Sequence, residues 1–300
     1  MTEESMKKRS RFLEPEARCD YYIDANMKSV WKVQLDIVEE FIRICEAHNL
    51  KYFAIGGTLL GAIRHGGYIP WDDDVDFAMM RDQYDLFCKY AKRELRHPYV
   101  LQNFESDIYF NEGLSKIRNS ETTQISTLAK EHRMRFNQGI CIDIFPLDGI
   151  GDKNMLQWQK KWDDWFKWLR SVIRRPLRKT IYGSVKDIVC RVVYFFMGKK
   201  LCRMREDLFR RQSIKDSTRV GLIAFNMSKT NWQWDKSLFA KSIYVPYEYI
   251  DIPIPERYDE ILRHQYGDWH KPVKGASSHS EIFFDVNKPY VEYLKEWGFI

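Results

Sequence analysis

The feature that most constrains this chain is a short apolar run that ends at two glycines and precedes, after a helix-like stretch, Asp74-Val75-Asp76. Tyr52–Ile55 is typical of a short strand, and Gly56-Gly57 ends it. Thr58 stands where a helix N-cap is expected, and the helix would end before the next glycine pair. Alternating apolar side chains from Asp74 onward predict a second strand. Strand, glycine turn, short helix and acidic strand therefore follow one another.

The two aspartates at the start of the second strand suit a divalent cation. Side chains at i and i+2 of a strand point to one side, with Cα atoms roughly 6.5–7 Å apart. A cation removes the repulsion between two such carboxylates. Asp143 is the candidate third carboxylate, because it alternates away from Ile142 and Ile144 in a later predicted strand and can face a cleft.

Each part of this pattern also has a plainer explanation. An isolated Asp-x-Asp is more often a solvated acidic loop, and Gly56-Gly57 alone is more often a tight turn. A calcium loop that starts at Asp72 fails, because Phe77 occupies its glycine position and Gln83 its final glutamate position. The combination is more specific, since amides of a glycine turn and of a helix N-terminus can point at a phosphate.

The stretch Gly56–Asp76 resembles the LicD family, whose members have a nucleotidyltransferase fold and include bacterial phosphocholine transferases and fukutin-type ribitol-phosphate transferases. The resemblance continues at Lys116-Ile117-Arg118 and Gly139–Asp148, and returns weakly at Tyr266–Trp269. It implies an α+β fold with a nucleotidyltransferase-like core, in which helices flank a mixed sheet. A helical basic insertion and a C-terminal α/β extension complete the expected architecture.

The same resemblance implies roles for individual residues. Asp74, Asp76 and Asp143 would bind Mg²⁺ (or Mn²⁺) and act in catalysis, with metal ligand and general base both open for Asp143. The donor would be a CDP-activated alcohol, with CDP-choline favoured, and the acceptor a glycan or lipid-linked glycan of lipopolysaccharide or teichoic acid biosynthesis. The residues expected to bind the donor's phosphates surround the glycine turn or lie on a basic strand: Gly56, Gly57, Thr58, Arg64, Lys116 and Arg118.

Charge divides the chain into regions. Residues 160–211 hold 16 lysines and arginines against 5 acids, although the whole chain carries only +6, so the remainder is acidic. Three regions are predicted: a catalytic core with an N-terminal helix at 1–150, a basic, tryptophan-rich helical insertion at 151–215, and a region at 216–300 that completes the domain. Four tryptophans of the insertion recur at helical spacing: Trp158, Trp162, Trp165 and Trp168. They could form a stripe that packs into the core, or a surface that binds an anionic membrane.

The remaining observations concern location and competing functions. The six cysteines form no C-x-x-C motif, and no apolar stretch suggests a secretory signal. A cytoplasmic protein is therefore expected, which could act at the inner face of the membrane. Transfer of a nucleotide to a small molecule, protein or RNA is the alternative activity. Nucleic-acid binding by the basic region is disfavoured, because an aspartate-lined cleft repels phosphates unless metal is present.

Overall fold

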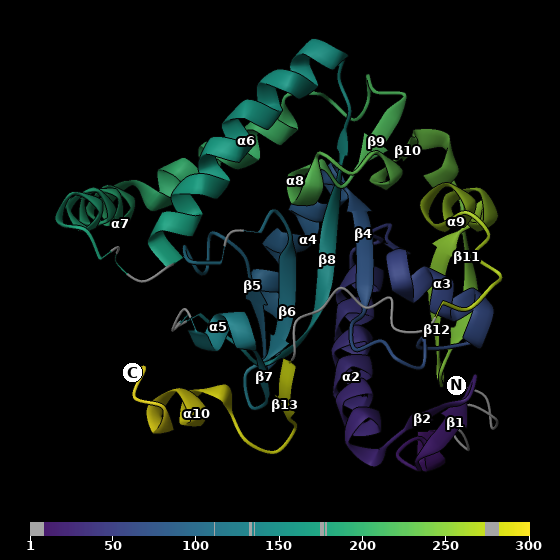
Figure 1. Ribbon diagram of the computed structural model, residues 1–300. Coiled ribbons are helices and arrows are strands. Elements are labelled where there is room, and N and C mark those ends of the chain that lie inside the picture. The colour runs from purple at the N-terminus through teal and green to yellow at the C-terminus, as the bar shows by residue number, and fades with distance from the viewer. Residues whose placement is uncertain are drawn as a thin grey trace.

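The computed structural model describes residues 9–110, 112–131, 134, 136–174, 177, 179–273 and 282–300. Its centre is a seven-stranded mixed sheet of order β10-β9-β8-β4-β3, in which β6 also pairs with β8 and β5 with β6 (Figure 1). β4 and β8 are parallel, and the other ladders are antiparallel. The strands are β3 (Phe53–Ala54), β4 (Asp76–Met80), β5 (Tyr99–Gln102), β6 (Ser115–Asn119), β8 (Ile140–Gly149), β9 (Arg219–Gly221) and β10 (Gln233–Asp235). The prediction of an α+β domain with a mixed sheet is confirmed.

Two helices cover one face of this sheet. α2 (Ala25–Ala47) begins at Asp24, whose carboxylate accepts a hydrogen bond from the Met27 amide at 2.8 Å. α4 (Arg81–Glu94) packs beside α2 and against β4 and β8. The ring of Phe41 on α2 contacts that of Phe77 on β4, with 5.0 Å between centroids. Because strand side chains alternate, Asp76 projects from the opposite face, which α2 and α4 leave uncovered.

Smaller elements surround the edges of the sheet. Two-stranded ribbons are formed by β1 with β2, β11 with β12, and β7 with β13. Their bounds, and those of the short helices, are β1 (Glu16–Arg18), β2 (Tyr21–Ile23), β7 (Thr123–Ser126), β11 (Ser242–Tyr247), β12 (Ile250–Pro255), β13 (Ile282–Asp285), α3 (Gly56–His65), α5 (Thr127–Glu131), α8 (Ile223–Asn226), α9 (Tyr258–Tyr266), α10 (Tyr290–Glu296), and 3₁₀ turns η1 (Thr230–Trp232) and η2 (Lys236–Phe239).

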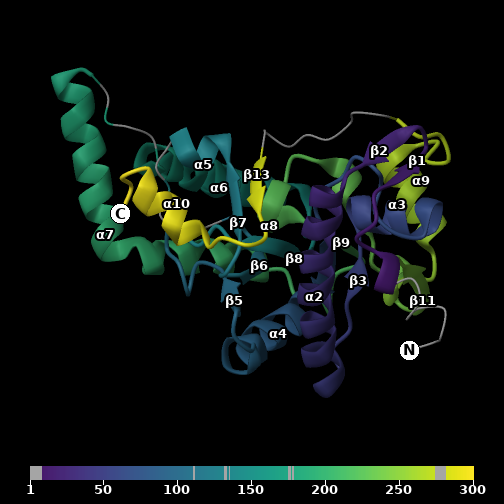
Figure 2. The ribbon, with the colours of Figure 1, turned by 90° about the horizontal axis from the view of Figure 1, so that it is seen from below.

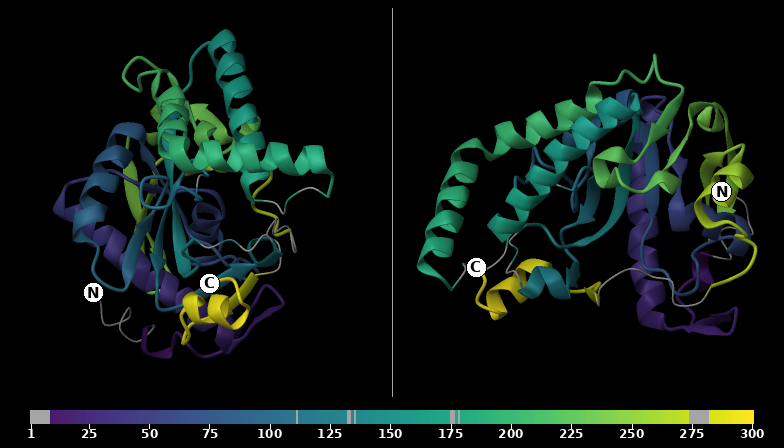
Figure 3. Two further views of the ribbon diagram at one scale, coloured as in Figure 1. Left: turned by 90° about the vertical axis from the view of Figure 1, so that its left-hand side faces the viewer. Right: turned by 45° about the horizontal axis from the view of Figure 1, so that its top comes forward.

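The basic insertion consists of two long helices, as expected: α6 (Lys153–Arg174) and α7 (Ile181–Arg210). They pack together along part of their length. α7 bends sharply, and one arm of it stands away from the rest of the protein (Figures 2 and 3). Within the described residues, no helix combines the length and apolarity that crossing a bilayer requires.

The boundaries around the glycine turn differ from those expected. α3 begins at Gly56 with Ile55 as its N-cap, so the expectation that Thr58 caps the helix is wrong. The Thr58 hydroxyl instead accepts a hydrogen bond from the Asp76 amide at 2.8 Å. β4 starts at Asp76, two residues later than predicted. Residues 72–74 therefore form a loop, whose conformation depends on tertiary contacts rather than on sheet pairing.

Candidate functional site

Three charged side chains lie next to one another across the uncovered face of the sheet. Asp76 of β4 is the register partner of Asp143 on β8, and Lys116 of β6 is the partner of Asp143 on its other side. Neighbouring strands are about 4.8 Å apart. The Lys116 ammonium lies 2.7 and 2.8 Å from the two carboxylate oxygens of Asp143. Residues far apart in sequence thus form one row, in which the carboxylates of Asp76 and Asp143 are neighbours and the Lys116 ammonium follows them.

The acidic loop before β4 adds further carboxylates to this row. Carboxylate oxygens of Asp72, Asp73 and Asp74 lie within 4.8 Å of one another. Helix α2 holds the backbone of this loop: the Trp31 indole donates to the Asp72 carbonyl at 3.0 Å, and Gln34 donates to the Asp73 carbonyl at 2.7 Å. This triplet is not the predicted set of Asp74, Asp76 and Asp143, although Asp74 belongs to both.

The charges of the loop acids Asp72 and Asp74 affect the pKa of Asp76 on β4. Burial, followed by the charges of Asp74, Asp143 and Asp72, raises the pKa of Asp76 well above its usual range. Burial opposes the charge of Lys116, but the Asp143 carboxylate outweighs it, so the pKa of Lys116 is raised. Oxygen ligands are those that Mg²⁺ prefers. The donor set therefore fits a divalent cation, whose charge would offset the repulsion around Asp76.

Both glycines of the turn lie against these acids. A Cβ added at Gly56, where φ is +58°, would come within 3.2 Å of the Asp76 Oδ2. A Cβ added at Gly57 would come within 2.6 Å of the Asp72 Oδ2. The N-terminus of α3 thus approaches the carboxylates so closely that a side chain there would displace them, which accounts for a glycine at each position.

The other residues expected to contact the donor have partners within the protein. Arg64 lines the cleft, but its Nη1 donates to the Trp269 carbonyl at 3.0 Å and its Nε to His65 at 2.9 Å. Burial, with Arg64 and Arg18 nearby, lowers the pKa of His65 to about 4, so His65 is neutral and can accept that bond. Arg118 is buried and donates to Gln102 and, at 2.6 Å, to the Gly139 carbonyl. Phosphate binding by Arg64 and Arg118 stays a prediction.

A cleft of about 380 Å³ opens beside the acids. Gly56, Gly57, Asp72, Asp74 and Asp76 line part of it. Aromatic side chains also line it, and sequence reasoning missed most of them. These rings come from the motif itself, from η1 and from the end of α9: Trp71, Trp232, Tyr266 and Trp269. The weak family signal at Tyr266–Trp269 was the one sequence indication that the C-terminal region contributes to the site.

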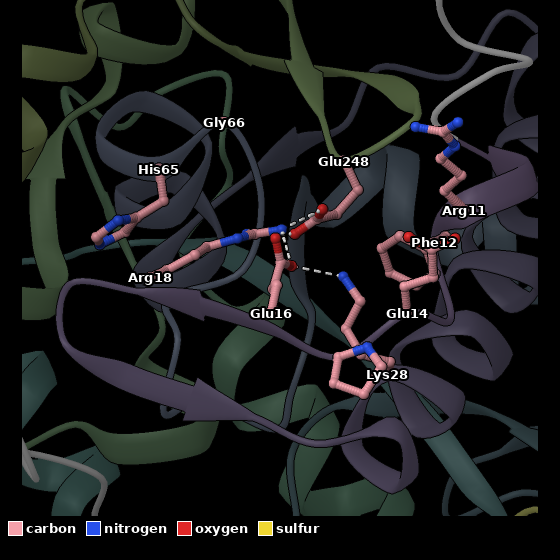
Figure 4. A pocket seen from close by; sticks show the side chains of 10 residues that line it. Arg11, Phe12, Glu14, Glu16, Arg18, Lys28, His65, Gly66 and Glu248 are labelled. Atoms are coloured by element: carbon pink, nitrogen blue, oxygen red, sulfur yellow. Dashed lines mark hydrogen bonds and ion pairs between the residues drawn. The ribbon is translucent and has the colours of Figure 1, made fainter.

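A second cavity, of about 590 Å³, lies behind the motif and is lined by paired charges (Figure 4). The Arg18 guanidinium donates to both carboxylate oxygens of Glu248 at 2.7 Å and to Glu16 at 2.7 Å. Lys28 donates to Glu16 at 2.6 Å. Glu248 also accepts from the Tyr68 amide at 3.0 Å. This network joins the β1–β2 and β11–β12 ribbons to the end of the motif, so it positions α3 rather than binding substrate.

We expect Glu248→Gln to lower the free energy of unfolding by about 3 kcal/mol, because it leaves a largely buried arginine without its bidentate partner. Chemical denaturation would measure the loss. Glu256→Gln is the matched control, since Glu256 and its partner Lys241 are exposed and 3.9 Å apart, and should cost less than about 0.5 kcal/mol. Equal losses in both variants would contradict a positioning role for Glu248.

Comparison with known proteins agrees with this geometry. Residues 49–186 match the family described as LicD/FKTN/FKRP, nucleotidyltransferase domain. The lipopolysaccharide cholinephosphotransferase LicD of Haemophilus influenzae is 29% identical over 248 residues, which are 80% of this chain and 89% of that protein. An uncharacterised protein of Rickettsia prowazekii is 27% identical over 142 residues, 46% of this chain and 42% of its own. The ribitol 5-phosphate transferase FKRP of Homo sapiens is 50% identical over 38 residues, 13% of this chain and 8% of its own.

The matched region contains the glycine turn, the acidic loop and both strands that supply Asp76 and Asp143. The agreement therefore rests on the residues that build the site, as well as on overall similarity. Residues 49–186 of this chain therefore form a nucleotidyltransferase domain of the LicD type.

Proposed function

We propose that this protein is a phosphotransferase that moves phosphocholine, or a similar alcohol phosphate, from a CDP-activated donor to a hydroxyl of a cell-surface glycan precursor. The observation that carries the proposal is the approach of Gly56 and Gly57 to the carboxylates of Asp76 and Asp72. Backbone amides and acids then face one cleft, as a phosphate and a cation together require. The relative from Haemophilus influenzae is named for transfer of the same group.

We propose that two Mg²⁺ (or Mn²⁺) ions are held by Asp74, Asp76 and Asp143. When bound, such ions neutralise charge on the transferring phosphate and activate the acceptor hydroxyl. Asp143 would serve the acceptor side, as metal ligand or as the base whose carboxylate takes the hydroxyl proton. Lys116, which holds both carboxylate oxygens of Asp143, would orient that group. The glycine turn would orient the diphosphate of the donor.

Incubation with a panel of CDP-alcohols, a divalent cation and a glycan acceptor tests the activity directly. We expect release of CMP with CDP-choline, and a slow release by hydrolysis where no acceptor is added. Release of pyrophosphate from a nucleoside triphosphate, with no CMP from any CDP-alcohol, would instead establish nucleotide transfer and overturn the proposed reaction.

We also propose that the enzyme works at the inner face of a membrane, where lipid-linked acceptors reside. The tryptophans of α6 support this, because Trp162, Trp165 and Trp168 are 47%, 44% and 42% exposed. Phe166 and Leu169 of the same helix are buried, so these three tryptophans lie at the border between the packed and the exposed surface of α6. Their exposed ring area is what a membrane interface would use.

The outer face of α7 extends the same surface. At 100° per residue, five of its exposed apolar side chains share one face: Ile181, Val185, Val189, Val192 and Phe196. Ile181 and Phe196 are 86% and 78% exposed. Lys199 and Arg203 continue that face one and two turns later, and both are exposed. Soluble monomers rarely expose apolar patches of this size without a binding partner.

The charge of this surface favours anionic lipid over a second copy of the chain. Exposed lysines and an arginine lie on the same two helices as the apolar side chains, and two copies that packed through these helices would bring them together: Lys160, Lys161, Lys186, Lys199, Lys200 and Arg203. Anionic headgroups instead contribute about 1 kcal/mol for each nearby basic residue. The insertion helices would thus lie on the membrane rather than cross it.

We expect the protein to co-sediment with vesicles that contain phosphatidylglycerol and to remain in solution with phosphatidylcholine alone. Phe196→Ser should weaken binding about tenfold, since burial of such a side chain is worth about 1.5–3 kcal/mol. Tyr22→Ser, which removes a ring that is 68% exposed in β2, is the matched control and should have no effect. A dimer in solution that buries Phe196, with no vesicle binding at low salt, would contradict membrane docking.

A further inference from the structure

The aromatic side of the catalytic cleft has no role in the reaction described so far. Trp71, Trp232, Tyr266 and Trp269 line the same 380 Å³ space as Asp72, Asp74 and Asp76. Metal binding and phosphate binding use the acids and the glycine turn. They do not account for four large rings gathered from three distant segments of the chain, so this wall is available for another part of a substrate.

Contacts with neighbouring side chains hold two of the rings in place. Trp232 stacks on Phe225, with centroids 5.3 Å apart and an interplanar angle of 11°, and the Lys229 ammonium lies 4.5 Å from the centre of its ring. The Trp269 indole donates to the Asp259 carboxylate at 3.1 Å and stacks on His270 at 3.9 Å. These contacts within the protein fix both rings, so little ordering would accompany binding.

Tyr266 and Trp71 bring aromatic surface next to the acids. Tyr266 is 43% exposed although it lines the cleft. Trp71 precedes Asp72 directly, and its ring meets Tyr21 edge to face at 5.9 Å. The basic side chains of the cleft are engaged elsewhere: Arg64 donates to the Trp269 carbonyl, and Lys271 lies 3.1 Å from the Asp268 carboxylate. The wall therefore combines aromatic rings with a surplus of negative charge.

This combination matches one ligand chemistry better than others. A quaternary ammonium has no hydrogen to donate and is stabilised by aromatic rings within about 6 Å and by nearby carboxylates. A sugar alcohol needs hydrogen-bond partners for each hydroxyl, and a primary ammonium needs acceptors aimed at its hydrogens. Against indole and phenol faces a primary ammonium loses hydrogen bonds to water, whereas a trimethylated cation has none to lose, so the rings favour the methylated cation.

We propose that Trp71, Trp232, Tyr266 and Trp269 form a subsite for the trimethylammonium group of the donor's alcohol. The inference rests on the proposed phosphotransfer and selects choline among the alcohols that the reaction could use. The phosphate next to the choline would lie at the acids, and the short choline chain would reach the neighbouring rings. Stacking of the cytosine ring on the same wall is the competing arrangement.

Equilibrium binding measured by calorimetry, with Mg²⁺ present, tests this assignment using phosphocholine, phosphoethanolamine and CMP as probes. We expect phosphocholine to bind about tenfold more tightly than phosphoethanolamine. Tyr266→Ala and Trp71→Ala should each lower the affinity for phosphocholine about tenfold and leave that for CMP within about twofold. Tyr266→Phe keeps the ring and should keep the phosphocholine affinity, which separates the ring from the hydroxyl.

Three results would overturn the subsite. Equal affinity for the two phosphorylated alcohols would show no selection of the quaternary ammonium. Loss of CMP affinity in Tyr266→Ala, with phosphocholine unaffected, would assign the rings to the base. Faster CMP release from CDP-ribitol than from CDP-choline would reject choline while the phosphotransfer itself stands. Conversely, ring-dependent phosphocholine binding without CMP release from any CDP-alcohol would reject the reaction and retain the subsite.

Discussion

Asp76→Asn is expected to lower turnover at least about a thousandfold without unfolding the protein. Several kcal/mol of charge stabilisation by a bound cation correspond to that factor. The side chain fits the same space, and the charge it loses is one that Asp74, Asp143 and Asp72 repel. In the absence of metal the melting temperature should therefore stay the same or rise, which is the reverse of what loss of a structural ion pair would produce.

The measurement pairs steady-state CMP release with thermal unfolding at several Mg²⁺ concentrations. The wild type should gain stability as metal is added, because a ligand that binds the folded state stabilises it. Asp76→Asn should gain little. Asp82→Asn is the matched control, since Asp82 is an exposed acid of α4. Near-normal turnover of Asp76→Asn with Mg²⁺ would show that the metal assignment is wrong.

Gly56→Ala is expected to cost far more activity than Gly66→Ala, although both glycines have left-handed backbones with φ of +58° and +64°. Backbone strain of about 1 kcal/mol should be common to both. Only at Gly56 does the added Cβ meet a carboxylate oxygen, 3.2 Å away, whereas nothing lies within 4 Å of the same atom at Gly66. A misplaced Asp76 should lower turnover about a hundredfold.

The two glycine variants should have similar melting temperatures, and their kinetics would be compared at saturating metal and donor. Gly57→Ala is the stricter test, because its Cβ would lie 2.6 Å from the Asp72 Oδ2. Full activity in Gly56→Ala and Gly57→Ala would mean that the acids do not need the close approach of the α3 N-terminus. Equal loss in Gly56→Ala and Gly66→Ala would trace the effect to backbone strain alone, since both glycines have positive φ.

Much of the core could be predicted from sequence because its signals are local. The alternation Ile142, Asp143, Ile144 placed Asp143 on the side of the sheet away from the core, and its register with Asp76 places the two acids side by side. The N-terminal helix expected in this region is α2, although nothing in the sequence indicates that Trp31 and Gln34 would bind the carbonyls of the acidic loop.

The parts that could not be predicted depend on contacts between distant segments. Thr58 resembles a helix cap, but the Asp76 amide binds its hydroxyl, and β4 begins later as a result. Arg118 lies two residues from Lys116 on the same strand, yet its guanidinium is buried against Gln102 and the Gly139 carbonyl. Trp232 reaches the cleft only because β9 and β10 extend the sheet. None of these outcomes has a local pattern.

In the basic insertion, a clear helical pattern in the sequence did not determine which way the tryptophan side chains point. Helical spacing of the tryptophans predicted a shared face, but not whether that face turns inward or outward. In the structure Trp162, Trp165 and Trp168 are 47%, 44% and 42% exposed, whereas Phe166 and Leu169 beside them are buried. The apolar face of α7 had no comparable signal, since its exposed side chains lie in a segment that is apolar on most sides.

Anomalous diffraction from crystals soaked with Mn²⁺ and CMP would locate the cation among the acids. The account predicts a peak coordinated by Asp76 together with Asp74 or Asp143, close to the glycine turn. A peak bound only by Asp72 and Asp73, or no peak in this cleft at saturating Mn²⁺, would contradict it.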